Sequence, residues 1–192
     1  MKATLLRQEI IPFSLTLMGL FLLTIYLDLM LHLFSWAWLG RYLGIPGVLL
    51  ILLSFGYSLR KRGLIRFSTP KRLLELHEIM TLVGALLICI HAGLHFNAWL
   101  PWLALAALLT NIVSGLIGRI LLKRSQQRLK AMKAEMKTAG KPAAVIEAAF
   151  QEASVATDLM KKWRSLHFPI TFVFVALSAL HVLSVILLGG AP

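Results

Sequence analysis

The chain is poor in cysteine and in charged residues. Cys89 is its single cysteine, which excludes an internal disulfide framework and a self-contained iron–sulfur site. No Cys-x-x-Cys-His motif occurs, so covalent attachment of a c-type haem is excluded as well. Charged residues make up 15% of the 192 positions and hydrophobic residues 58%, which is not the balance of a soluble domain. The composition therefore indicates a protein of the lipid bilayer.

Acidic residues are the scarcer charged type. The chain has 8 Asp and Glu against 20 Lys and Arg, so its formal net charge is +12. A basic chain can bind nucleic acid, but these bases gather in a few loops beside apolar segments, and we expect no nucleic-acid partner. We also expect no cleavable signal peptide, because the first apolar run is long and lacks a small-residue cleavage site.

Five apolar stretches are long enough to cross the ~30 Å hydrocarbon core, which takes about 20 helical residues. They run from about Ile11 to Phe34, Tyr42 to Leu59, Leu73 to Phe96, Leu100 to Leu122 and Leu166 to Leu188. Pro46, Pro101 and Pro169 are expected in the first turns of their helices, where a missing N–H is tolerated. The predicted fold is an all-α membrane protein, a bundle of five transmembrane helices.

The Lys and Arg residues are distributed unevenly among the loops. Nineteen of them lie in the N-terminus, in residues 60–72 and in residues 119–164, and Arg41 is alone on the opposite side. Because basic loops are retained in the cytoplasm, we expect a cytoplasmic N-terminus and an outer C-terminus in the plasma (inner) membrane. Four tryptophans mark the predicted outer boundary, at positions 36, 38, 99 and 102, and Trp163 marks the inner one.

One segment outside the membrane has appreciable size. Residues 123–165 separate the first four helices (1–122) from the fifth (166–192), which completes the same domain. Apolar residues recur there at helical spacing among Lys and Arg, with a break at Gly140 and Pro142. We predict a cytoplasmic amphipathic helical hairpin whose first part lies along the inner lipid surface. Docking of a cytoplasmic partner is the alternative.

Histidines recur at one spacing in two of the predicted membrane helices. His77 and His91 are fourteen residues apart, and so are His167 and His181. On an α-helix this spacing leaves both side chains within roughly 40° of one face and roughly 21 Å apart along the axis. The charge distribution makes the two helices parallel, so His77 should meet His167 near the cytoplasm. His91 should likewise meet His181 nearer the outside.

Paired intramembrane histidines at two depths are typical of proteins that hold two b-type haems. A polar side chain in hydrocarbon is costly unless it has a partner, and a histidine pair supplies both axial ligands of a haem iron. Gly84, midway between the first two histidines, would let the backbone approach a porphyrin. Arg119 is a candidate partner for an inner-haem propionate, with snorkelling to lipid headgroups as the alternative. The predicted ligand pairs are His77/His167 and His91/His181.

Three further polar residues suggest a quinone site. Asp28 and His32 are one turn apart, and His95 is one turn beyond His91. We hypothesise that Asp28, His32 and His95 bind a quinone near the outer haem and move its protons. A packing contact between Asp28 and His32 is the alternative. His95 could instead contact a propionate or interfacial water, or replace His91 as the ligand.

The runs LHEIMTLVGALLICIHAGLHF and WRSLHFPITFVFVALSALHVL resemble the ferric-reductase-like transmembrane domain and the di-haem cytochrome b subunits of quinol-linked complexes. The resemblance covers roughly residues 70–188 and rests on the paired histidine spacing. It implies haem ligands on the third and fifth helices. The chain shows no sixth helix and no flavin or nicotinamide domain, so we expect electrons to enter from a quinol or a separate subunit.

These observations predict the electron-transfer subunit of a quinone-linked membrane oxidoreductase. It would pass electrons across the bilayer between the quinone pool and a partner redox subunit. Two alternatives stay open. One is a stand-alone ferric-reductase-like haem enzyme that acts on a small acceptor at the outer face, and the other is a haem-free membrane assembly or transport protein.

Overall fold

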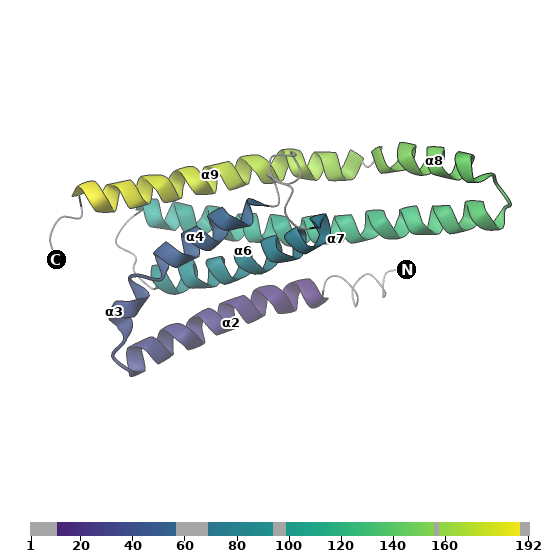
Figure 1. Ribbon diagram of the computed structural model, residues 1–192. Coiled ribbons are helices and arrows are strands. Elements are labelled where there is room, and N and C mark those ends of the chain that lie inside the picture. The colour runs from purple at the N-terminus through teal and green to yellow at the C-terminus, as the bar shows by residue number, and fades with distance from the viewer. Residues whose placement is uncertain (1–10, 57–68, 94–98, 156–157, 189–192) are drawn as a thin grey trace.

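The computed structural model describes residues 11–56, 69–93, 99–155 and 158–188, and all elements in these ranges are α-helices (Figure 1). Five helical segments are long and apolar enough to cross a membrane, which confirms the predicted number. Many of their large apolar side chains are exposed, as lipid-facing residues would be. The helices are α2 (Ile11–Leu33), α3 (Ala37–Gly40), α4 (Gly44–Ser54), α6 (Pro70–Ala92), α7 (Trp99–Thr138), α8 (Ala143–Val155) and α9 (Asp158–Leu188).

A short helix and a turn precede the second predicted helix. The sequence predicts this helix from about Tyr42, and α4 begins at Gly44, after a turn at residues 41–43 that separates it from α3. Gly40 and Gly44 border this turn, and glycine is a weak helix former. With 11 residues, α4 is roughly 16 Å long, and the candidate membrane span comprises α3 and α4 together, from Ala37 to Ser54. Pro46 lies in the first turn of α4, as predicted.

The prediction that Pro169 lies in the first turn of the fifth helix is wrong. The helix α9 begins at Asp158, so Pro169 lies inside it. A proline there has no N–H to donate to the carbonyl of Ser165. The sequence places the helix start at the edge of the apolar run, but the helix extends over the polar residues that precede this run.

The helix α7 continues well past the predicted end of the fourth membrane segment. It has 40 residues, which makes it roughly 60 Å long, about twice the hydrocarbon thickness. The stretch 123–138, which we expected to lie along the lipid surface, instead continues the axis of the membrane helix. Gly140 ends α7 with a positive φ of 69°, and α8 then lies beside the distal half of α7 (Figure 1).

The membrane helices form two closely packed pairs. The first pair is α4 with α6, and the second is α7 with α9, while α2 lies against α6. Figure 1 shows α6 and α9 running in the same direction, as the sequence predicts. A small core joins both pairs, with side chains from four helices: Ile51, Ala85, Leu108, Ile112 and Phe174.

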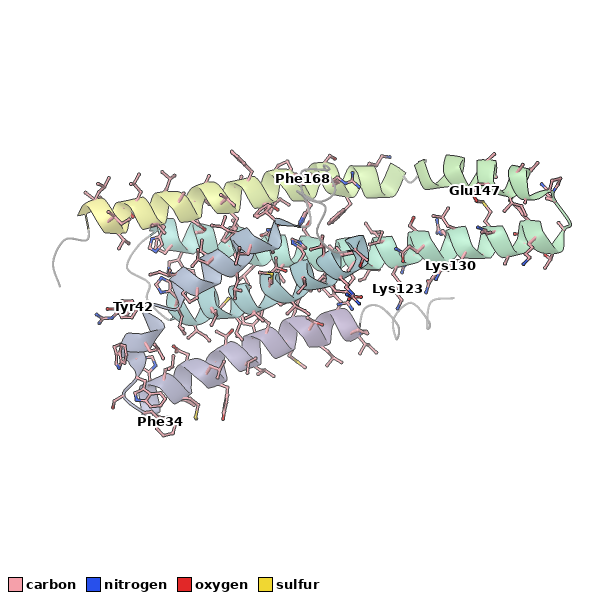
Figure 2. The ribbon with its side chains drawn as sticks, in the orientation of Figure 1. Phe34, Tyr42, Lys123, Lys130, Glu147 and Phe168 are labelled. Carbon is pink, nitrogen blue, oxygen red and sulfur yellow. The ribbon has the colours of Figure 1, made fainter. Side chains whose placement is uncertain are left out.

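Aromatic and basic side chains lie at opposite ends of the bundle. Figure 2 shows Phe34 and Tyr42 at the end where α2 stops and α4 starts. Lys123 and Lys130 project from the part of α7 that extends beyond the other end. On that extension Lys133 pairs with Glu147 of α8 at 3.9 Å. This separation is the one expected of interfacial aromatic residues and retained basic loops.

Candidate functional site

The helix α6 directs His77 and His91 toward backbone carbonyls of the α3–α4 segment. The Nδ1 atom of His77 lies 3.1 Å from the Ser54 carbonyl oxygen, and that of His91 lies 3.3 Å from the Gly40 oxygen. A carbonyl only accepts hydrogen bonds, so Nδ1 carries the proton in both rings. In the neutral imidazole the lone pair is then on Nε2. Histidines that ligate metals have this arrangement.

The helix α9 brings the other two histidines to the same two levels. His181 lies opposite His91, with ring centroids 6.4 Å apart and ring planes inclined by 55°. His77 and His167 are close enough to interact electrostatically. The outer histidines are therefore in ring contact, and the inner two lie near each other across the two helix pairs.

The spacing of the outer rings matches that of two ligands on one metal. An imidazole nitrogen lies about 2.0–2.1 Å from a bound metal ion, so two imidazoles on opposite sides of one ion have centroids roughly 6–6.5 Å apart. The observed 6.4 Å lies in that range. Two axial imidazoles need not be coplanar, so the 55° inclination is compatible with such a site. The separation of His91 and His181 is thus compatible with two ligands of one haem iron.

The inner histidine His167 rests on α7. Its Nδ1 lies 3.1 Å from Ser114 Oγ. The indole of Trp163 stacks on its ring, with centroids 4.8 Å apart and planes inclined by 21°. Thr171 links α9 to α7 through a hydrogen bond to Asn111 Oδ1 of 2.8 Å. These contacts fix α9 against α7 at the level of His167.

Gly84 faces α4. A Cβ atom at position 84 would lie 2.7 Å from the Gly47 carbonyl oxygen and 2.8 Å from Ile51 Cγ1. The absent side chain is therefore explained by close contact between two helices. The predicted contact of Gly84 with a porphyrin stays a prediction.

Arg119 lies beside the inner histidine level. Its Nη1 atom is 3.3 Å from Glu78 Oε2, and Glu78 follows His77 directly on α6. The ion pair joins the two helix pairs at this level. Because the Arg119 side chain is 63% exposed, part of the guanidinium stays accessible to another anion such as a propionate.

The predicted quinone residues are only partly brought together. His32 Nδ1 lies 2.9 Å from the backbone oxygen of Asp28 and 3.8 Å from its carboxylate, so the two residues do share a face of α2. The His32 side chain is 58% exposed. His95 lies outside the described residues.

An apolar groove of about 330 Å³ lies between α4 and α9. Its lining includes Phe174, Ser178 and Val182, which are neighbours of His181 along α9. No group of three or more His, Cys, Asp or Glu side chains suited to a metal ion occurs in residues 11–56, 69–93, 99–155 and 158–188. A haem iron needs only two such side chains, because the porphyrin supplies its other ligands.

Of the four residues that hold the histidines in place, two leave no signal in the sequence. Ser54 and Gly40 act through backbone carbonyls, and such contacts leave no residue-type signal. Ser114 and Trp163 do leave one. Trp163 precedes His167 by one helical turn, and Ser114 belongs to a small-residue stripe that would allow close packing.

Comparisons with known protein families, with characterised proteins and with solved structures found no match for this chain. The resemblance to the ferric-reductase-like domain therefore stays a prediction from the paired histidine spacing.

Proposed function

We propose that this chain is an integral membrane di-haem b-type cytochrome that passes electrons across the bilayer. The observation that carries the proposal is the outer pair, in which the His91 and His181 rings stand 6.4 Å apart. His77 and His167 lie near each other at another depth of the same helices and would form the second pair. The common spacing of fourteen residues in both helices supports the proposal as well.

The residues of this chain would hold and orient two haems. Haem, when bound, supplies one-electron reduction and oxidation. The four histidines would supply nitrogen ligands, and the Nδ1 contacts of His77, His91 and His167 would leave Nε2 of these three rings for the metal. Between the two levels, buried Ala85 and Phe174 exclude water, and the levels are roughly 21 Å apart along the axis. Arg119 is placed to contact a propionate at the inner level.

The chain works as the electron-transfer subunit of a larger quinone-linked oxidoreductase. Its basic end, with the α7–α8 extension, faces the cytoplasm together with the N-terminus, and its aromatic end faces outward. One haem exchanges electrons with the quinone pool and the other with a partner redox subunit. The basic extension also contacts anionic lipid where α7 leaves the membrane.

The first test is the haem content of the purified protein. We expect dithionite-minus-oxidised spectra of b-type haem and two haems per chain, and His91→Ala should reduce this to one. His95→Ala should keep both haems, because His91 contacts the Gly40 carbonyl and faces His181. Purified protein without b-type haem bands would contradict the proposal, and loss of one haem in His95→Ala would move the ligand role to His95.

The second test concerns quinol. Asp28→Asn and His32→Ala should each slow haem reduction by a quinol analogue on the order of 100-fold, because a positioned base contributes at least that much to proton transfer. Rapid-mixing absorbance of the haem bands measures the rate. Reduction by dithionite serves as the control and should be unchanged. An unaltered quinol rate in both variants would remove Asp28 and His32 from the quinone site.

A further inference from the structure

Trp163 is placed in the bundle as a support for a histidine. The sequence predicts it as an interfacial aromatic residue, but its ring stacks on His167 at 4.8 Å. The ring planes deviate by only 21° from parallel. A tryptophan whose sole role is to mark the interface would not need a ring contact with a haem ligand.

The indole of Trp163 is itself fixed by α7. Its Nε1–H donates a hydrogen bond of 2.8 Å to the Ser114 carbonyl oxygen. Its six-membered ring lies over Gly118, where any side chain would collide with it. These contacts leave the indole little freedom to turn.

His167 is therefore held by two groups at once. The indole covers one face of the imidazole, and Nδ1 lies 3.1 Å from the hydroxyl of Ser114. Ser114 thus contacts both residues, Trp163 through its carbonyl and His167 through its side chain. Rotation of the imidazole about its Cβ–Cγ bond would break the stack and this hydrogen bond together.

The outer ligand on the same helix has different surroundings. Within the part of the chain that the structure describes, the ring contact of His181 is with His91. The support by an indole is therefore specific to the inner level.

We propose that Trp163 is a positioning residue that fixes the plane of the His167 imidazole and thereby sets the properties of the inner haem alone. This inference rests on the proposed haem ligation. The orientation and hydrogen bonding of an axial ligand tune the reduction potential of the iron. The angle between the two axial imidazole planes also determines the largest g value of a low-spin ferric haem.

The test uses proteins that keep one haem each. Trp163→Leu and Trp163→Phe are made in a His91→Ala chain, which retains the inner haem, and in a His77→Ala chain, which retains the outer one. We expect Trp163→Leu to shift both the largest g value and the midpoint potential of the inner haem. Trp163→Phe keeps an aromatic face but loses the Nε1–H donor, so its shifts should be smaller. A tenfold change in the preference for ferric over ferrous haem would move the potential by about 59 mV.

Trp38→Leu is the matched control, since Trp38 is exposed and its ring contact is with Tyr42. It should leave both haems unchanged. Unshifted inner-haem signals in both Trp163 variants, or equal shifts in the His77→Ala chain, would overturn the inference while the haem proposal stands. If the Trp163→Leu protein binds no haem, the largest g value and the midpoint potential of the Trp163→Phe protein test the inference instead. A wild-type chain without haem would instead remove the proposed function.

Discussion

Replacing Gly84 by alanine is expected to destabilise the bundle by about 1–3 kcal/mol, the usual cost of overpacking a tight contact. The new methyl group would lie 2.7 Å from the carbonyl oxygen of Gly47 and 2.8 Å from Ile51 Cγ1. A backbone oxygen cannot move aside alone, so α4 as a whole would have to retreat from α6. The carbonyls of Ser54 and Gly40 would then retreat from His77 and His91.

Thermal unfolding followed by circular dichroism in detergent measures this effect in the haem-free and haem-loaded protein. Gly19→Ala is the control, because nothing lies within 4 Å of a Cβ atom there. It should be neutral or stabilising by about 0.5–1 kcal/mol, as alanine favours a helix over glycine. If Gly84→Ala lowers the stability of the haem-loaded protein only, the predicted contact of Gly84 with a porphyrin is supported. No effect in either form would show that α4 and α6 lie farther apart.

The sequence is a good guide to the membrane helices because hydropathy depends only on residue type. It predicts all five segments and the break at Gly140. It fails where neighbouring structure decides. The helix α9 begins at Asp158, eight residues before the predicted start at Leu166. The four-residue helix α3 is likewise not predicted, since it lies ahead of the expected helix start at about Tyr42.

The sequence also predicts which histidines meet, since helical periodicity and loop charge together determine both face and direction. What surrounds them depends on tertiary contacts. Gly84 is predicted at a porphyrin, yet its close neighbours belong to α4. Arg119 is predicted near a propionate, and the structure pairs it with Glu78 beside His77. In both cases the sequence indicates a candidate residue, but it does not show which neighbouring helix the side chain contacts.

Gly44→Ala is expected to weaken outer haem binding by about 10–100-fold, the range found when a residue that orients a metal ligand is lost. A Cβ atom at this position would lie 2.7 Å from Cδ2 of His91 and 2.9 Å from its Cγ and Nε2. The imidazole would have to move away. Its Nδ1, already 3.3 Å from the Gly40 oxygen, would lose that hydrogen bond.

Haem titration of the apo-protein separates the two sites, because the inner pair is supported by Ser54, Ser114 and Trp163 and not by Gly44. Gly44→Ala should therefore bind the inner haem with wild-type affinity, and Gly19→Ala should bind both. Equal weakening at both sites would mean that the substitution disturbs the bundle generally. Unchanged binding at both would mean that His91 does not need the space that Gly44 leaves. A selective loss would tie the start of α4 directly to the outer ligand, because Gly44 leaves room for the His91 imidazole.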